Sequence, residues 1–442
     1  MEVTRLPRDP GPAAWNRLLP EAAPATPLEG ATTADWLIIG AGFAGLAAAR
    51  RLSQNCPGDR ITILDATQVG EGPAGRNSGF MIDLPHDLAS DGYSGALDRD
   101  RAQTADNRLA IAFAEEMFED FGLPEETFRK TGKVNAAATA KGARINSEYA
   151  RHLAALDEPH EQMSAKDMQE MTGIDYYRSG LFTPGAVTIQ PAMFIRGIAE
   201  GLRSNRMSLH ENSPVIRLER RGDWVATTLK GQVTAPRVIL AVNGHLNSFG
   251  FAQGRLMHVF TYASMTRALT PVEAARLGGH AHWGVLPADP QGTTVRRING
   301  VGGVRIVVRN RFTFDPSMEV EDRRIARVAR DHDASFRARF PELAGVEMEY
   351  RWGGRLCLSL NGVQLVAEVE EGLFTACCQN GLGTTRGTLA GMLAADLATG
   401  RRSDALNRIT DAVPKRLPPE VVSRVGANLR LRWGAWRAGG EF

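Results

Sequence analysis

Three glycines near the start of the chain have the spacing of a phosphate-binding turn. Gly40, Gly42 and Gly45 form G-x-G-x-x-G directly after an apolar run at residues 36–39, and an Ala- and Leu-rich segment follows them. The first glycine permits the tight bend, the second lets the backbone approach a pyrophosphate, and the third lets a helix pack close to a sheet. The N-terminus of that helix would direct free N–H groups and a partial positive charge at the phosphates.

Asp65 supplies an acidic group at the place where such a turn needs one. It ends a second apolar run, residues 61–64, and lies twenty residues after Gly45. A carboxylate there accepts hydrogen bonds from a ribose 2′-OH. The order of strand, glycine turn, helix, strand and acid predicts a bound dinucleotide, FAD or NAD, and this stretch alone does not choose between them.

Two further stretches have the composition of ligand-binding loops. Residues 69–80 read VGEGPAGRNSGF, and this density of small and polar residues indicates a backbone wound closely around a ligand. We expect Arg76 to pair with a phosphate or a carboxylate there. Residues 379–385 read QNGLGTT and lie between an apolar run and a predicted helix, which repeats the strand, glycine turn and helix of the N-terminal region. A cofactor held from both ends of the chain favours FAD over NAD.

The composition limits the classes of protein to which this chain can belong. The 442 residues suit two joined domains, and 52 Lys and Arg against 50 Asp and Glu give no sign of nucleic-acid binding. No apolar run is long enough to span a bilayer, and the N-terminus lacks the apolar region of a signal peptide. The four cysteines show no metal-binding spacing, so we expect no metal and a cytoplasmic protein.

The predicted elements divide the chain into a Rossmann-like cofactor domain and an inserted α+β domain built on an antiparallel sheet. The terminal regions are a Pro- and Ala-rich arm, either pinned by Trp15 or disordered, and a basic tail with an amphipathic pattern. We expect that tail to be an interaction or packing element. The predicted boundaries are 1–34 for the arm; 35–100, 180–250 and 345–416 for the FAD-binding domain; 101–179 and 251–344 for the substrate domain; and 417–442 for the tail.

The motifs together resemble one known family. IIGAGFAGLAAA, AGRNSGF, AVNGH, RWGG and NGLGTT occur in that order between residues 38 and 385. In this the chain resembles the D-amino-acid-oxidase-like FAD-dependent oxidoreductases, and it is most similar to their gamma-glutamylputrescine-oxidase-like branch. It departs from the family at residues 359–364, SLNGVQ, where T-x-D-x-x-P is usual. The implied fold is α/β, with a glutathione-reductase-type FAD domain.

The resemblance implies a set of cofactor-binding positions. They are Gly40, Gly42, Phe43, Ala44, Gly45, Asp65, Ala66, Gly75, Arg76, Asn77, Ser78, Asn243, Gly244, Gly354, Asn380, Gly381, Leu382, Gly383 and Thr384. It also places Cys357 near the cysteine that tethers the flavin covalently in the sarcosine-oxidase branch. Because most free cysteines are small buried apolar residues, we expect non-covalent FAD.

The activity implied by the resemblance is oxidation of a C–N bond in a small amine or amino-acid-like substrate. A hydride equivalent would pass to flavin N5, the imine would hydrolyse, and O2 would reoxidise the flavin to give hydrogen peroxide. Two alternatives stay open: an opine-type dehydrogenase subunit that passes electrons to a partner or quinone, and a flavin-binding protein without turnover. The substrate, the oligomeric state and the electron acceptor are not determined by the sequence.

Substrate contacts are expected on the strands of the inserted domain. Tyr262, Arg305 and His258 are the candidate catalytic residues, and an arginine there, Arg305 or Arg309, would hold a substrate carboxylate by a two-pronged bond. His86, soon after the glycine-rich loop, is a further candidate.

Overall fold

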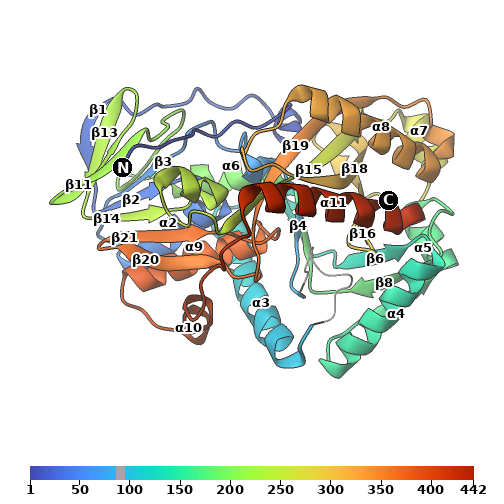
Figure 1. Cartoon of the computed structure of the whole chain (residues 1–442). Helices are drawn as coiled ribbons and strands as arrows, with labels where there is room; N and C mark the ends of the chain where they lie inside the picture. Colours follow the sequence, from blue (N-terminus) through green and yellow to red (C-terminus); the bar gives the residue numbers. More distant parts are fainter. Residues whose placement is uncertain (86–94) are drawn as a thin grey trace.

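The chain folds around two large β-sheets that lie side by side (Figure 1). The computed structural model describes residues 1–85 and 95–442, the side chains of residues 421 and 422 excepted. Both sheets were expected, one for a cofactor and one for a substrate, and the mixed α/β architecture is confirmed.

The first sheet has six strands, five of them parallel. Its central strands are buried on both faces, which is why their sequences are continuous apolar runs and do not alternate. In spatial order the strands are β10 Met207–His210, β3 Ile61–Leu64, β2 Trp36–Ile39, β14 Arg237–Leu240, β21 Leu373–Cys377 and the antiparallel β20 Leu365–Glu370.

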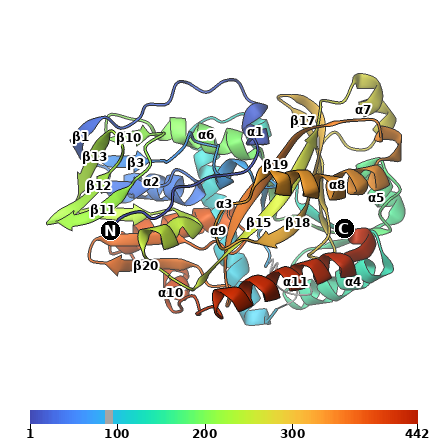
Figure 2. The ribbon, with the colours of Figure 1, turned by 45° about the horizontal axis from the view of Figure 1, so that its top comes forward.

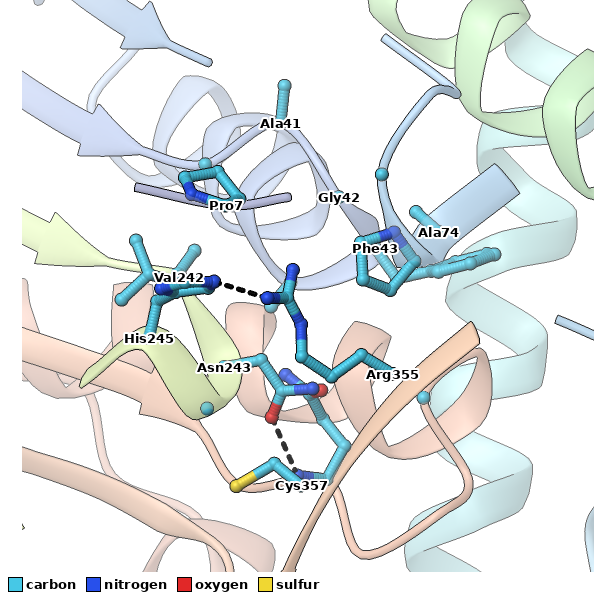
Figure 3. A pocket seen from close by; sticks show the side chains of 18 of the residues that line it. Pro7, Ala41, Gly42, Phe43, Ala74, Val242, Asn243, His245, Arg355 and Cys357 are labelled. Atoms are coloured by element: carbon cyan, nitrogen blue, oxygen red, sulfur yellow. Dashed lines mark hydrogen bonds between the residues drawn. The ribbon is translucent and has the colours of Figure 1, made fainter. Parts of the chain in front are cut away.

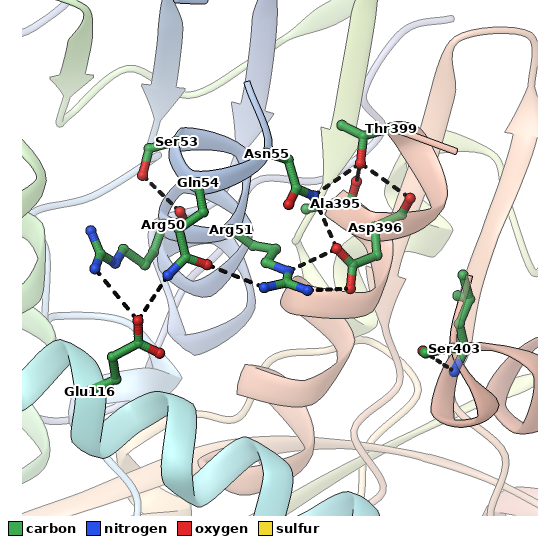
Figure 4. A network of polar contacts seen from close by, with 11 residues as sticks. Arg50, Arg51, Ser53, Gln54, Asn55, Glu116, Ala395, Asp396, Thr399 and Ser403 are labelled. Atoms are coloured by element: carbon green, nitrogen blue, oxygen red, sulfur yellow. Dashed lines mark hydrogen bonds and ion pairs between the residues drawn. The ribbon is translucent and has the colours of Figure 1, made fainter. Parts of the chain in front are cut away.

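Helices α2 Phe43–Asn55 and α9 Thr385–Ala398 follow the two predicted glycine turns and pack against each other. A Cβ on Gly391 would lie 2.0 Å from Ala44 O, so this glycine is needed for the close approach of the two backbones. The Arg51 guanidinium donates to both carboxylate oxygens of Asp396, at 2.7 and 3.1 Å (Figure 4). The N-terminal and C-terminal turns are therefore held in one rigid unit.

The second sheet has eight strands and is antiparallel except where β16 pairs with β6. In spatial order they are β19 Met348–Ser359, β15 Leu256–Thr266, β18 Gly303–Phe314, β17 Thr294–Gly300, β16 Trp283–Pro287, β6 Lys133–Ala137, β8 Ser179–Thr183 and β7 Glu161–Ser164. Helix α8 Asp322–Arg339 covers one face of the sheet, where Ser264 Oγ lies 2.7 Å from His332 Nδ1.

The other described strands form two small sheets. One is β1 Gly30–Thr33, β13 Gly231–Ala235, β12 Asp223–Thr227 and β11 Arg217–Arg221; the other is β4 Phe80–Met81, β9 Val187–Ile189 and β5 Phe128–Arg129. The chain turns at Gly132, whose φ is +64°, and this turn separates β5 from β6. The remaining helices are α1 Ala14–Arg17, α3 Leu97–Asp120, α4 Ala140–Ala155, α5 Ala165–Thr172, α6 Pro191–Leu202, α7 Pro271–Leu277, α10 Asp404–Thr410 and α11 Glu420–Ala438.

The N-terminal arm is an ordered part of the fold (Figure 2). Its first residues bond to the small sheet, with Val3 N donating to Ile216 O at 2.9 Å. Further along, Pro10 O accepts from Gly353 N on β19 at 3.1 Å. Trp15 is buried and its Nε1 donates to Asn77 O at 2.8 Å. Pinning by Trp15, and not disorder, is therefore what the structure shows.

The C-terminal helix α11 packs on the second sheet (Figure 2). Asn428 exchanges two hydrogen bonds with the backbone of Phe314 on β18, at 3.0 and 2.9 Å. Beyond the helix, one Glu441 carboxylate oxygen accepts from Ala138 N, Thr139 N and Thr139 Oγ1 at the start of α4. None of the described helices combines the length and the apolar character that crossing a membrane requires.

Candidate functional site

A cavity lies at the carboxyl ends of the parallel strands of the first sheet, where open α/β sheets bind their ligands. Both predicted glycine turns line it. The N-terminal arm contributes Pro7 and the second sheet contributes Arg355 and Cys357 (Figure 3). Of the predicted cofactor positions, the cavity is lined by Gly40, Gly42, Phe43, Ala44, Asp65, Ala66, Asn77, Ser78, Asn243, Gly244, Gly381, Leu382, Gly383 and Thr384.

The first turn has the geometry that its three glycines predict. Gly40 has a φ of +106°, and a Cβ there would lie 2.6 Å from Ala241 O. Gly42 is different: a Cβ on it would touch only Ala74 Cβ, at 3.6 Å, so the space in front of it is open to a ligand. Gly45 does not line the cavity; its Cβ would lie 1.7 Å from Gly40 O, which makes it a packing glycine.

Asp65 lies at the end of β3, beside the first turn. Its Oδ2 accepts from Ala41 N at 2.8 Å, and its Oδ1 accepts from Thr67 N at 2.9 Å. Burial raises the pKa of Asp65, and these N–H donors act in the opposite direction. The carboxylate is thus fixed by backbone groups while it still forms part of the cavity wall, as a ribose acceptor must.

Some residues of the glycine-rich loop line the cavity, and others contact the N-terminal arm. Asn77 and Ser78 line the cavity, whereas Gly75 and Arg76 do not. The buried Arg76 guanidinium donates to four backbone oxygens, those of Glu71 at 2.6 Å, Pro10 at 3.0 Å, Gly11 at 2.9 Å and Gly353 at 3.5 Å. In place of the expected phosphate or carboxylate, Arg76 therefore binds the N-terminal arm to the loop.

The C-terminal turn approaches the same cavity from the opposite end. Asn380 lies behind it with a φ of +51° and supports the turn, because its Oδ1 accepts from Ser359 N at 2.8 Å. Asn243 Oδ1 accepts from Cys378 N at 3.1 Å, which ties the end of β14 to this turn. Gly354 also lies outside the lining and packs on the backbone of Arg76, where a Cβ would be 3.2 Å from Arg76 O.

Neither helix that opens into the cavity has a side-chain cap. Gly42 is the N-cap of α2 and Thr384 is the N-cap of α9, and neither side chain accepts from the first turn of its helix. Thr384 Oγ1 donates instead to Phe80 O at 2.6 Å. The free N–H groups and the open space at Gly42 fit a pyrophosphate-containing cofactor, which needs backbone donors and no side chain in that position.

Two polar residues of the cavity wall, Arg355 and His245, were not proposed from the sequence. Arg355 is buried, and its Nη1 lies 2.5 Å from His245 Nε2 (Figure 3). Its Nη2 lies 3.4 Å from Asp9 Oδ1 on the N-terminal arm. His245 ends the A-V-N-G-H motif and Arg355 follows R-W-G-G. These motifs indicate that both regions lie near the cofactor, but they do not indicate that these two side chains contact each other.

The three predicted catalytic residues lie outside the cavity lining. Tyr262 points to the face of the sheet covered by α8, and its OH is 2.7 Å from Thr313 Oγ1. Arg305 is paired with Glu349, its Nη1 lying 2.5 Å from Glu349 Oε2. His258 Nε2 lies 3.0 Å from Asn247 Oδ1, and burial lowers the pKa of His258 to about 4.

Arg309, the other predicted arginine, does line the cavity. It lies on the same strand as Arg305 but four residues along it, which is about 13 Å in a β-strand. The neighbouring wall is apolar and is formed by the cluster Phe80, Ile82, Leu286 and Leu382. A guanidinium beside an apolar wall is suited to a small molecule with a carboxylate.

Cys357 lines the cavity with a buried side chain. A hydrogen bond with Cys378 and burial raise the pKa of the Cys357 thiol well above its usual value, which keeps it in the less reactive thiol form. The candidate His86 lies outside the described residues. Within residues 1–85 and 95–442, no group of three His, Cys, Asp or Glu side chains is placed to hold a metal.

Comparison with known proteins supports the same reading. The model of the family described as FAD dependent oxidoreductase, DAO, matches residues 35–397. The probable oxidoreductase OrdL of Rhizobium meliloti (strain 1021) is 26% identical over 419 residues, 90% of each chain. Gamma-glutamylputrescine oxidoreductase of Escherichia coli (strain K12) is 24% identical over 391 residues, 86% of each chain.

The fold is also that of a solved structure. The crystal structure of glycine oxidase from Geobacillus kaustophilus matches with a TM-score of 0.68 at 19% identity, covering 84% of this chain and 96% of that one. The family resemblance read from the motifs is thereby confirmed, together with FAD as the cofactor. The chain belongs to the DAO family of FAD-dependent oxidoreductases.

Proposed function

We propose that the protein is an FAD-dependent oxidase that breaks a C–N bond in a small amine bearing a carboxylate. The observation that supports this most is the position of Arg309 in the cavity wall, beside the apolar cluster of Phe80, Ile82, Leu286 and Leu382. When bound, FAD supplies the two-electron oxidation of the carbon next to nitrogen.

The side chains of the cavity would orient the substrate for that oxidation. Arg309 binds the carboxylate, which fixes the direction of the amine end. The apolar wall excludes water and favours a neutral amine, since burying a charged ammonium without a partner is unfavourable. His245 is neutral in this cavity, because burial and the charge of Arg355 lower the pKa of its side chain to about 2.

The relatives narrow the choice of compounds to test. Their names include gamma-glutamylputrescine and glycine as substrates of other family members. A useful panel for the holoenzyme therefore contains N-alkyl glycines, opines, D-amino acids and gamma-glutamylputrescine, each paired with its decarboxylated amine. The measurement is anaerobic loss of the oxidised-flavin absorbance.

Bleaching by a carboxylate-bearing amine, and weaker bleaching by its decarboxylated partner, is the expected result. Rapid return of the absorbance in air with formation of hydrogen peroxide would support an oxidase. Slow return in air, with fast return on adding a quinone or dye, would replace the oxidase by a dehydrogenase. No bleaching by any amine would contradict the proposal as a whole.

A further inference from the structure

A second, smaller pocket lies on the other side of Phe80 from the cofactor cavity. It shares no lining residue with that cavity. Its walls are strands β16 and β17 of the second sheet, the short helix Glu125–Thr127 with β5 after it, and helix α1. The side chains that matter here are Trp15, Glu126, Arg129, His282, Arg296 and Val301.

Arg296 is the central group of this pocket. Its side chain is 92% buried, since its exposed fraction is 8%. The guanidinium lies between two aromatic rings, 5.3 Å from the centre of Trp15 and 5.4 Å from that of Phe80. Its Nη1 donates to the backbone oxygens of Ser78, Gly79 and Ile189 at 2.8, 3.1 and 3.0 Å.

The other edge of this guanidinium has no partner in the described part of the chain. No hydrogen bond from Arg296 Nε or Nη2 is present there, and no carboxylate oxygen lies within ion-pair distance. Burial alone lowers the pKa of Arg296 to about 9, and no nearby carboxylate raises it again. A buried, charged guanidinium without a counter-ion is unfavourable, so an anion that reached this edge would be strongly stabilised.

Two other side chains of the pocket, Arg129 and His282, also favour an anion. Arg129 has only a long contact, 3.9 Å, with the exposed Glu125 carboxylate. His282 Nδ1 accepts from Asn299 N at 3.3 Å, which leaves its Nε2 as the donor of a neutral ring. The acid in the pocket, Glu126, already accepts from Val301 N with both oxygens, at 3.1 and 3.0 Å.

We infer that this pocket binds the carboxylate group of a small ligand against the Nε–Nη2 edge of Arg296. That edge presents two parallel N–H groups, which match the two oxygens of a planar carboxylate in a two-pronged bond. Arg129 and His282 lie in the same pocket and supply further donors to the bound anion. The inference does not depend on the proposed oxidase activity, since it concerns a different pocket.

Binding of a ligand in this pocket should affect the surroundings of the flavin. Arg296 Nη1 holds the carbonyls of Ser78 and Gly79, and Ser78 lines the cofactor cavity. A carboxylate pulling on the opposite edge of the same guanidinium changes the position and polarisation of those bonds. The visible spectrum of bound FAD is therefore a reporter of binding that needs no turnover.

The experiment is a titration of the holoenzyme with acetate, malonate and inorganic phosphate at constant ionic strength. The readouts are the flavin difference spectrum and the thermal unfolding temperature. We expect a saturable spectral change and a higher unfolding temperature with the two carboxylates, and weaker binding of phosphate. Tighter binding of phosphate than of either carboxylate would overturn the ligand class.

Substitutions at the exposed rim locate the site without touching Arg296, whose three carbonyl bonds the loop needs. Val301→Glu places a negative charge at the mouth and should abolish the saturable change, whereas Val301→Gln should keep it. Arg129→Gln should weaken binding about tenfold, the usual effect of losing one charge-assisted hydrogen bond.

Two controls separate this pocket from other sites. Val272→Glu adds the same charge on exposed α7, outside the pocket, and should have no effect. Every titration is made in the Arg309→Met holoenzyme, so that a flavin response cannot come from the carboxylate-binding arginine of the cofactor cavity. In that background, a response that survives Val301→Glu, or no saturable response to either carboxylate, would overturn the inference.

Discussion

Arg355 Nη1 lies 2.5 Å from His245 Nε2 on the wall of the cofactor cavity. Because a guanidinium only donates, Nε2 must accept, and the ring proton lies on Nδ1, 3.2 Å from Ser248 Oγ. Burial and the positive charge of Arg355 lower the pKa of His245 to about 2. The pair therefore carries one positive charge, and that charge belongs to the arginine.

The first prediction concerns acid stability. Besides His245, burial lowers the pKa of His258 to about 4 and that of His332 to about 3, from an ordinary value of 6.5. Below pH 6.5 the unfolded chain takes up protons at these sites and the folded chain does not, so stability is complete above pH 6.5 and falls as the pH drops. Each histidine should cost about 2 kcal/mol of unfolding free energy between pH 7 and pH 5.

Chemical denaturation at the two pH values measures this loss. His332→Gln should reduce the difference in unfolding free energy between pH 7 and pH 5 by the amount that one histidine contributes, about 2 kcal/mol. His280→Gln, at an exposed position, is the matched substitution for comparison. An unfolding free energy independent of pH in this window would contradict the prediction.

The glycine turn provides a matched pair of substitutions. Gly42→Val should give a folded protein without FAD, because a side chain there enters the open space of the cavity and touches only Ala74. Gly45→Ala should instead destabilise the fold by about 3 kcal/mol or more, since its Cβ would lie 1.7 Å from Gly40 O. The ratio of flavin to protein absorbance and the unfolding temperature distinguish the two effects. Normal flavin content in Gly42→Val would count against the assigned cofactor position.

We predict that Cys357 forms no covalent bond with the flavin. The covalent link would require attack by a thiolate, and the hydrogen bond with Cys378 and burial keep this side chain protonated. Acid precipitation should therefore release FAD into the supernatant from both the unmodified protein and Cys357→Ala. Yellow colour that remains in the pellet, and disappears in Cys357→Ala, would show a covalent bond.

Arg309 and Arg305 should differ sharply in their effect on turnover. Arg309→Met removes the guanidinium from the cavity and should lower kcat/KM for a carboxylate-bearing substrate about ten- to a hundredfold, the value of a charged hydrogen bond. The decarboxylated amine should lose much less. Arg305→Met breaks the pair with Glu349 far from the cavity and should change stability but not kcat/KM. Equal losses in the two variants would remove Arg309 from the substrate site.

The end of the chain is predicted to contribute to stability. Glu441→Ala leaves Ala138 N and Thr139 N without their acceptor at the start of α4 and should cost about 3 kcal/mol of unfolding free energy. Glu420→Ala, on the exposed first turn of α11, is the control. FAD content should stay normal in both. Removal of residues 417–442 should have the larger effect on stability, because the Asn428 bonds to Phe314 are lost as well.

Local patterns in the sequence predicted the cofactor side of the molecule well. The turn around Gly42 is determined by neighbours within thirty residues, and its geometry follows from the missing Cβ atoms. The substrate side was harder, because successive strand residues point to opposite faces of a sheet. Tyr262 lies on a strand of the second sheet but faces α8, and Arg305 pairs with Glu349 on the same strand as Arg309 but four residues from it.

Contacts between segments that are distant in the sequence could not be predicted from local sequence patterns. Arg76 has the surroundings of a phosphate ligand, yet its donors are taken by Pro10 and Gly11, more than sixty residues earlier. Asp9 reaches Arg355 across almost the whole chain. A Pro- and Ala-rich arm has no periodicity, so the sequence could not show that it forms part of the cavity.

The arm has a consequence for the rate at which cofactor is exchanged. Val3, Arg5, Leu6, Pro7 and Asp9 form one wall of the cavity, and this wall is fixed at both ends, by Ile216 and by Gly353. We expect bound FAD to leave on this side only when those backbone bonds and the contact between Asp9 and Arg355 open. Retention of FAD is thus governed by the opening frequency of the arm as well as by affinity. We therefore expect a chain that folds without cofactor to close this wall early and to regain activity slowly when FAD is added afterwards.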